Sequence, residues 1–178
     1  MTESIRENYE KDGVEGFYRR EGGHYRNPHE DALCATLSRC MSWGLDLSRV
    51  LDLGAGSGEV TLFLQEHGVQ PEQIDACDPY TGAAFLERVG RPCAGWSFRD
   101  LVGGALEGRQ YSLIVASYSL HLCPESMLPS LMMALGRHSA ALLCLSPHKR
   151  PELRWGWRLE REGYDPIDRV RARLYHLG

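Results

Sequence analysis

Short apolar runs alternate along the chain with longer stretches of helical periodicity. The apolar runs predict strands at residues 49–53, 74–77, 96–98, 111–117, 140–145 and 169–177. Apolar residues spaced three and four apart predict helices at residues 29–41, 57–68, from Gly82 onward, and at 124–137 and 151–162. Strands that alternate with helices are typical of an α/β fold with a doubly wound, mostly parallel sheet. Because no linker or repeat divides the chain, residues 1–178 are expected to form a single domain.

The two ends of the chain depart from this alternation. Residues 1–28 are polar, glycine-rich and aromatic, and their second half is expected to pack on the body as a lid. Residues 48–178 are the expected core of the domain. After residue 146 the pattern contains only one clear strand. Either the C-terminal edge of the sheet is abbreviated and lacks a strand, or residues 154–159 form a strand although their pattern resembles that of a helix.

Composition narrows the class of protein. The chain is 43% hydrophobic and 25% charged, and its net charge of −4 argues against a globally basic nucleic-acid binder. No apolar run approaches the roughly 20 residues of a membrane span, and the first residues lack a signal-peptide core. The six cysteines include no CxxC pair, so they are expected to be reduced, buried thiols and not a zinc site. A cytoplasmic protein with no metal site and no membrane contact is the expectation.

Residues 50–61, VLDLGAGSGEVT, join an apolar strand to a glycine-rich turn and a helix. Gly54, Gly56 and Gly58 let the backbone turn sharply next to a ligand, and the start of the helix offers free N–H groups. This predicts a nucleotide-type site at the C-terminal edge of the sheet. The GxGxG spacing differs from the GxGxxG dinucleotide fingerprint, and no Lys-Ser/Thr pair follows as in a P-loop. Asp52, just before the turn, is expected to face the ligand and to favour a cationic nucleoside over NAD.

VLDLGAGSGEVT resembles the first motif of class I S-adenosylmethionine-dependent methyltransferases, and three further stretches match that family in order across residues 48–146. The resemblance implies a Rossmann-like fold with S-adenosylmethionine as cofactor. Asp78 matches the acid that holds the ribose hydroxyls in this family. Residues 99–101 resemble the third motif, which frames the adenine. YSLIVASYSLHLCPE resembles the fourth motif of methyltransferase-11/12-like members, whose strand ends beside the methionine part of the cofactor.

The residues themselves and the resemblance together give a set of expected cofactor-binding residues. They are Tyr25, Asp52, Gly54, Ala55, Gly56, Asp78, Pro79, Tyr80, Arg99, Asp100, Leu101 and Ser117. Simpler roles stay open for the acids: Asp78 as a helix N-cap, Asp100 as a solvated turn residue paired with Arg99, and Asp52 as a half-buried residue bonded to nearby backbone.

Methyl transfer from a sulfonium is an in-line displacement, for which the protein mainly supplies positioning and desolvation. A general base is needed only when the acceptor is protonated and poorly nucleophilic. Tyr118, His121 and His148 follow predicted strands and are the candidates for the chemistry. We take His121 as the candidate catalytic base, with a neutral interior histidine as the alternative.

The acceptor is expected to be recognised by the two ends of the chain. Residues 148–161, HKRPELRWGWRLER, combine basic and aromatic side chains that can bind RNA, but they also read as the solvated face of a helix, which we favour. RNA, a protein and a small metabolite stay open as acceptors or partners. The alternative function is a subunit that binds S-adenosylmethionine but is catalytically silent within a methyltransferase complex. An NAD-dependent enzyme ranks third.

Overall fold

A computed structural model describes Gly16 and residues 22–178 of the chain. The part of the expected N-terminal lid that falls on residues 1–15 and 17–21 lies outside the described residues. The remainder of that lid, from Gly22 to Pro28, lies within the described residues.

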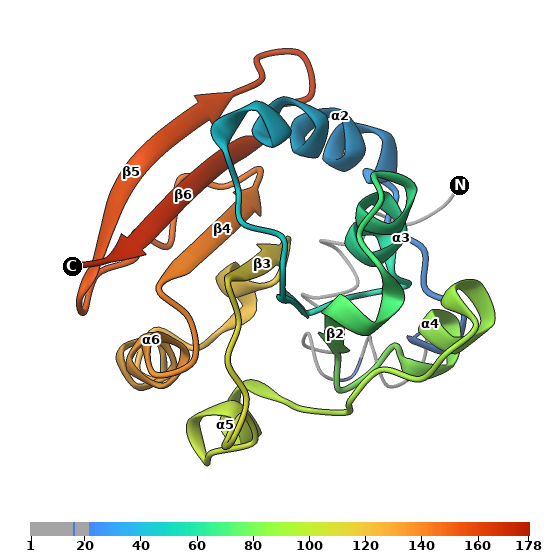
Figure 1. Ribbon diagram of the computed structural model, residues 1–178, viewed down its shortest axis with the longest axis horizontal. Coiled ribbons are helices and arrows are strands. Elements are labelled where there is room, and N and C mark those ends of the chain that lie inside the picture. Colours follow the sequence, from blue (N-terminus) through green and yellow to red (C-terminus); the bar gives the residue numbers. More distant parts are fainter. Residues whose placement is uncertain (1–15, 17–21) are drawn as a thin grey trace.

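The described residues build a six-stranded sheet in the order β2-β1-β3-β4-β6-β5 (Figure 1). The strands are β1 (Val50–Leu53), β2 (Ile74–Cys77), β3 (Leu113–Ser117), β4 (Ala141–Ser146), β5 (Trp157–Tyr164) and β6 (Arg171–Leu177). Strands β2, β1, β3 and β4 pair in parallel, whereas β6 runs antiparallel to both of its neighbours, β4 and β5. The prediction of a doubly wound, mostly parallel α/β sheet is confirmed.

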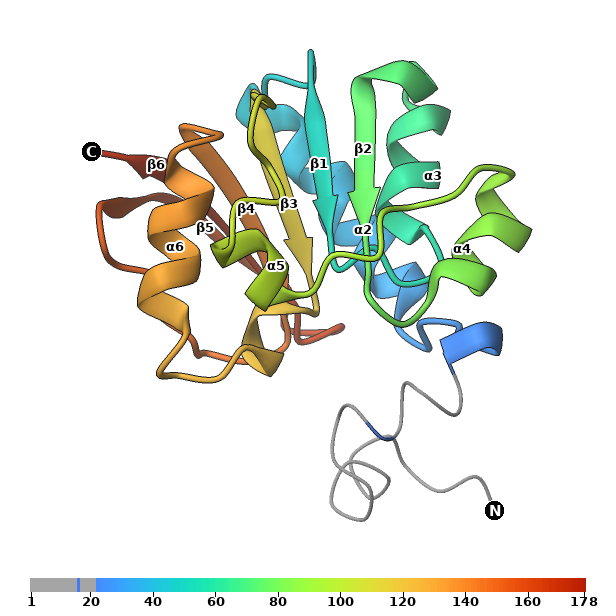
Figure 2. The same ribbon diagram turned by 90° about the horizontal axis from the view of Figure 1, so that it is seen from below.

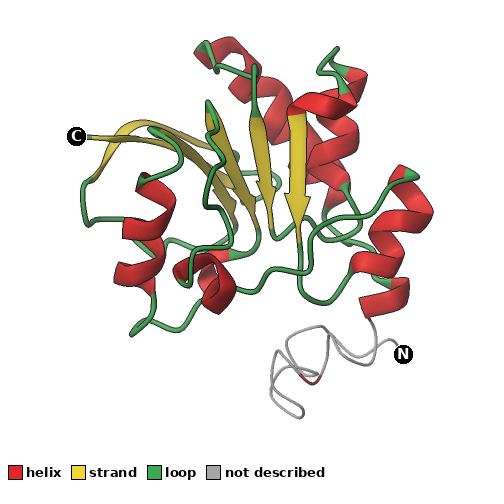
Figure 3. Cartoon of the chain, turned by 60° about the horizontal axis from the view of Figure 1, so that its bottom comes forward, coloured by secondary structure: helices red, strands yellow, loops and turns green. Residues whose placement is uncertain are grey.

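Helices cover both faces of this sheet, as Figures 2 and 3 show. The helices are α2 (Glu30–Cys40), α3 (Glu59–Glu66), α4 (Gly82–Val89), α5 (Phe98–Val102) and α6 (Leu128–Gly136). Short 3-10 turns add η1 (Gly22–His24), η2 (Met41–Trp43), η3 (Pro71–Gln73) and η4 (Leu120–Leu122). The core on one face joins the sheet to α2 and α3, and the core on the other joins it to α5 and α6. Helix α4 packs beside the glycine turn instead.

The central strands explain why their sequences are apolar throughout. Every residue of β1 and β3 is buried. In β1, Val50 belongs to the core under α2 and α3, while Leu51 and Leu53 belong to the core under α5 and α6. Alternate side chains thus enter opposite cores, as expected for a parallel sheet that is covered on both faces.

The strand expected at residues 96–98 is absent from the described structure. Near these residues, the described chain has only an isolated parallel β-bridge, between Ala94 and Cys77 at the end of β2. Helix α5 begins at Phe98, because Ser97 and Asp100 form a reciprocal capping box in which Ser97 Oγ accepts from the Asp100 amide. A short apolar triplet next to such a cap was therefore misassigned as a strand.

The prediction of a helix at residues 151–162 is also wrong. The structure has a strand in this region, as the alternative for residues 154–159 proposed. Strand β5 occupies the outer edge of the sheet with β6 as its neighbour, so both strands of the C-terminal edge are present and this edge is not abbreviated. What is short is the connection from β4, which contains no helix between residues 147 and 156. Most of β5 is exposed, and an edge strand that is polar on both faces lacks the period-two alternation that identifies a strand.

Candidate functional site

A cavity of about 670 Å³ opens at the carboxyl ends of β1, β2 and β3. We call it the first cavity. It lies where the chain order changes between β1 and β3, the position at which open α/β sheets bind their ligands. Its lining is Tyr25, Asn27, Leu53, Gly54, Gly56, Glu59, Asp78, Pro79, Tyr80, Thr81, Trp96, Ser97, Phe98, Arg99, Ser117, Tyr118, Ser119, Leu122, Pro124 and Met127.

The glycine turn after β1 forms the floor of this cavity. Gly54 has φ +71°, and a Cβ there would lie 2.5 Å from the Ser119 side chain, so only glycine fits. Both Gly54 and Ala55 donate their amides to the Cys77 carbonyl, which ties the turn to the end of β2. The glycines thus set the shape of this turn, and Gly54 and Gly56 both line the cavity.

Asp78 lines the cavity directly after β2. Its Oδ1 accepts hydrogen bonds from the amides of Tyr80 (2.9 Å) and Thr81 (3.0 Å), and its Oδ2 accepts one from Gly56 (3.2 Å). These amides fix the carboxylate between the two turns. Oδ1 thus accepts two hydrogen bonds already, whereas Oδ2 accepts one and can accept another from a ligand in the cavity. The N-cap of α4 is Thr81, so the N-cap role left open for Asp78 is wrong; Asp78 instead bonds the turn before that helix.

One wall of the cavity is aromatic and was not predicted. Trp96, Ser97, Phe98 and Arg99 line the cavity, as does the Pro79-Tyr80 turn. Aromatic side chains in a cavity wall suit a planar heterocycle. The sequence signal for this wall was the pair of aromatic residues Trp96 and Phe98 in a largely polar stretch. The pair was assigned to a strand instead.

Asp52 does not face the cavity. It is fully buried, and its Oδ2 accepts hydrogen bonds from the Thr61 amide (3.1 Å) and the Thr61 hydroxyl (2.7 Å). As the neighbour of Leu51 and Leu53, its side chain leaves β1 on the α3 face and not at the strand end. Burial, more than the charges of Glu59 and Asp78, raises the pKa of the Asp52 carboxyl to about 7, against the opposing hydrogen bonds from Thr61.

This pKa gives Asp52 a testable effect on stability. Between about pH 4 and pH 7 the folded chain keeps the Asp52 proton that the unfolded chain loses, so stability falls as the pH rises through this window. Asp52→Asn keeps an acceptor for Thr61 and cannot ionise. We expect the variant to gain, relative to the wild type, on the order of 1–3 kcal/mol in free energy of unfolding between about pH 5 and pH 8. Urea denaturation at both pH values measures the difference, and parallel profiles would refute a raised pKa.

Three other residues implied by the resemblance also lie outside the lining. Ala55 and Leu101 are core residues, exposed by only 3% and 2%. The Asp100 carboxylate is exposed and accepts hydrogen bonds from the Ser97 amide (2.8 Å) and hydroxyl (2.6 Å), which lower its pKa. Asp100 thus caps α5, close to the turn role that the sequence left open, although its partner is Ser97 and not Arg99.

Residues 22–28 lie over the glycine turn. A Cβ on Gly56 would meet the Tyr25 ring at 3.1 Å, and one on Gly22 would meet the Tyr80 carbonyl oxygen at 2.5 Å. The Asn27 amide donates to Glu59 Oε1 at 3.2 Å. This part of the predicted lid is therefore packed against the floor of the first cavity, and Tyr25 belongs to the lining.

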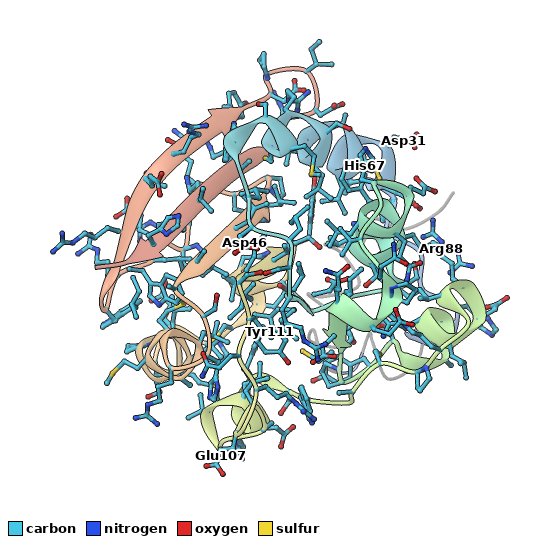
Figure 4. All side chains as sticks on the ribbon, viewed as in Figure 1. Asp31, Asp46, His67, Arg88, Glu107 and Tyr111 are labelled. Atoms are coloured by element: carbon cyan, nitrogen blue, oxygen red, sulfur yellow. The ribbon has the colours of Figure 1, made fainter. Side chains whose placement is uncertain are left out.

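Arg88, in the last turn of α4 (labelled in Figure 4), joins this helix to the starts of two others. From α4 its guanidinium pairs with Glu30 in the first turn of α2 and with Glu59 at the start of α3, the latter at 3.5 Å. Glu59 is nearly buried and also accepts from the Ser57 hydroxyl. Glu59 is a cavity residue that the sequence reading missed, because an acid at a helix start is ordinarily explained by the helix dipole.

The end of β3 contributes Ser117 and Tyr118 to the lining. Tyr118 has φ +51°, an uncommon conformation for a bulky residue and one that is frequent at functional sites. Its ring stacks on His29 with centroids 5.8 Å apart. Burial, followed by the charge of Asp168, raises the pKa of the Tyr118 hydroxyl to about 12. The hydroxyl is therefore protonated at neutral pH and suited to donating a hydrogen bond.

His121 and His148 line a different cavity, with ring centroids 4.7 Å apart. Burial and, to a smaller extent, the neighbouring His148 lower the pKa of His121 to about 4. A base of this strength is poorly matched to proton abstraction at neutral pH. The structure thus gives no support to His121 as the base at the first cavity.

Residues 23–171 match the family model described as a methyltransferase domain. The chain belongs to this methyltransferase family. It is also 35% identical over 197 residues to the "Uncharacterized protein C17A5.05c" of Schizosaccharomyces pombe, covering 86% of this chain and 79% of that protein.

Solved methyltransferase structures share the fold. Magnesium protoporphyrin IX methyltransferase (ChlM) from Synechocystis PCC 6803, with bound SAH, has a TM-score of 0.62 at 15% identity, over 98% of both chains. The N-methyltransferase NodS from Bradyrhizobium japonicum WM9, in complex with S-adenosyl-l-homocysteine, has a TM-score of 0.62 at 16% identity, over 90% of this chain and 96% of that one. A ribosomal protein L11 methylase from Lactobacillus delbrueckii subsp. bulgaricus has a TM-score of 0.58 at 15% identity, over 86% and 80%. One protein is named for a porphyrin and another for a ribosomal protein, so the fold does not select the acceptor.

Two features are absent from the described residues of the methyltransferase domain. No group of three or more His, Cys, Asp or Glu side chains there is arranged to hold a metal ion. In the same part of the chain, no helix has the length and apolar character needed to cross a bilayer.

Proposed function

We propose that the chain binds S-adenosylmethionine in the first cavity and transfers its methyl group to an acceptor. The observation that carries this proposal is the juxtaposition of the Asp78 carboxylate with the glycine turn after β1, bridged by the hydrogen bond from the Gly56 amide to Asp78. A carboxylate that can still accept a hydrogen bond suits the hydroxyl groups of a ribose, and glycines, which have no Cβ, suit close approach of a charged amino-acid group to the backbone. Relatives of the same fold were solved with SAM or SAH bound.

The lining divides naturally among the parts of this cofactor. Asp78 would hold the ribose hydroxyls, and the residues Pro79-Tyr80 and Trp96–Arg99 would hold the adenine. Gly54, Gly56 and Ser117 would face the methionine part. When bound, the cofactor supplies an electrophilic methyl group on a positively charged sulfur.

The protein's own contribution is positioning and exclusion of water. Tyr25 and Asn27 cover the cofactor side, while Tyr118, Leu122 and Met127 line the side that is left for an acceptor. The protonated Tyr118 hydroxyl can orient an acceptor by donating a hydrogen bond to it, but it does not remove a proton at neutral pH. The geometry therefore favours an acceptor that is already nucleophilic.

Incubation with methyl-labelled S-adenosylmethionine tests the activity. The purified chain is offered separately to RNA, protein and metabolite pools, and we expect the label to enter one of them. Label transfer should be strongly reduced in Asp78→Asn at cofactor concentrations below saturation. Silence across all pools while S-adenosylhomocysteine still binds would point instead to a catalytically silent binding subunit. The single-domain extent of residues 1–178 and the cytoplasmic location stay predictions.

A further inference from the structure

A second cavity of about 650 Å³ lies on the other side of the segment that follows β3. Its lining is Leu120, His121, Cys123, Glu125, Leu128, His148, Arg150, Pro151, Glu152, Arg154 and Trp155. Residues of the segment 117–128 divide between the two cavities: Leu122 and Met127 face the first, whereas His121 and Cys123 face the second. The two cavities share no lining residue, and the segment 117–128 contributes residues to both.

The second cavity carries charge of both signs. Arg154 is paired with Glu152 at 3.0 Å, and both side chains are largely exposed, so this pair is weak. Arg150 and Glu125 form no ion pair with any other described residue. A free guanidinium suits one phosphate group, and a free carboxylate suits amino or hydroxyl donors. The lining thus fits a ligand that has both an anionic group and hydrogen-bond donors.

The two histidines add hydrogen-bonding groups at the wall. Nδ1 of His121 is buried and has no hydrogen-bond partner among the described residues. An unsatisfied buried nitrogen is costly, which makes it a position where a ligand's polar group would be favourable. With its lowered pKa the His121 ring is neutral at pH 7, so it offers one donor and one acceptor beside His148.

Trp155 supplies an exposed aromatic surface at this cavity. It has φ +58° and is followed by Gly156 with φ +92°, so a tight turn holds the indole there at a conformational cost. Trp155 is 40% exposed, whereas Trp157 is 4% exposed and donates its indole N–H to the Met132 carbonyl. Trp157 is thus a core residue, while Trp155 has a free ring face on which a planar base can stack.

We propose that the second cavity binds a nucleotide, with its base stacked on Trp155 and its phosphate at Arg150. Glu125 and the histidine pair would accept and donate hydrogen bonds at the base or ribose. As a statement about the acceptor, this rests on the proposed methyl transfer, because a nucleotide bound one wall away from the cofactor would belong to the molecule that is methylated. As a statement about binding, it stands on the second cavity alone.

Calorimetric titrations with mononucleotides (AMP, GMP, CMP and UMP) and with a short single-stranded RNA of mixed sequence test the proposal. Trp155→Ala and Arg150→Gln should each weaken nucleotide binding by roughly 10-fold. Tyr164→Ala removes an aromatic residue of similar exposure (48%) outside the cavity and should leave binding unchanged. Circular dichroism checks that each variant is folded.

The outcomes separate the sources and the two proposals. RNA that binds more tightly than every mononucleotide identifies an RNA acceptor, and equal affinities identify a free nucleotide. No binding of either ligand at millimolar concentration, or binding that both cavity variants leave intact, overturns the nucleotide site. Label transfer to protein alone contradicts the inference that the bound nucleotide belongs to the acceptor. Titration of the same variants with S-adenosylhomocysteine, expected to match the wild type, keeps failure at this site distinct from failure of the cofactor site.

Discussion

Asp78→Asn is expected to weaken the binding of S-adenosylhomocysteine by about 10- to 100-fold. The carboxylate lies in the lining of the first cavity, and its charge strengthens the hydrogen bonds that it can accept from a ribose diol. Asparagine preserves the shape and keeps an acceptor for the amides of Tyr80 and Thr81, but it loses the charge and one acceptor. Isothermal titration calorimetry of the wild type and the variant measures the change in Kd.

Asp100→Asn is the matched control for this prediction. The resemblance to the methyltransferase family implied both acids as cofactor ligands, yet only Asp78 lines the cavity, while Asp100 caps α5 through Ser97. We expect the Kd of Asp100→Asn to stay within about 2-fold of the wild type. Asp78→Ala should lose at least as much affinity as Asp78→Asn while remaining folded by circular dichroism. Equal losses in the two asparagine variants, or an unaffected Asp78→Asn, would show that Asp78 is not the ribose ligand.

Gly58→Ala is expected to lower the free energy of unfolding by about 2–4 kcal/mol. Gly58 has φ +92°, and a Cβ there would lie 2.3 Å from Val89 Cγ2 and 3.3 Å from the Phe85 ring. The branched Val89 side chain can yield only if α4 moves away from the glycine turn. The loss therefore combines a strained backbone conformation with overpacking, and urea denaturation measures it.

Gly68→Ala separates these two causes. Gly68 has nearly the same φ, +90°, but no atom lies within 4 Å of its hypothetical Cβ. We expect a loss of about 1 kcal/mol for this variant, which reports the backbone term alone. If both alanine variants lose the same free energy, the close packing of α4 against the turn contributes nothing measurable.

The parts of the fold that the sequence predicted are those with a strong local pattern. The residues of β1 and β3 are apolar because both faces of these strands are covered, and the glycines of the turn have the conformations that only glycine adopts readily. Asp78 was predicted because a lone acid directly after an apolar strand must lie at the sheet edge. In each case the residue types at consecutive positions carry the signal by themselves, although the contacts that they make are with distant parts of the chain.

The errors arose where a distant neighbour decides the outcome. Asp52 bonds to Thr61, which lies on the next helix, so its direction could not be read from the strand alone. Strand β5 exists because β6 offers it an edge, although its own sequence is charged on both faces. His121 and Leu122 are adjacent but face different cavities, because the short turn η4 directs successive side chains to opposite sides.

Titration of the wild-type chain with S-adenosylhomocysteine and with NAD tests the central claim most directly. The first cavity combines the glycine turn, a carboxylate at the proposed ribose position and aromatic side chains at the proposed adenine position. We predict saturable binding of S-adenosylhomocysteine at a single site and no detectable heat with NAD. Binding of NAD without binding of S-adenosylhomocysteine would contradict the account.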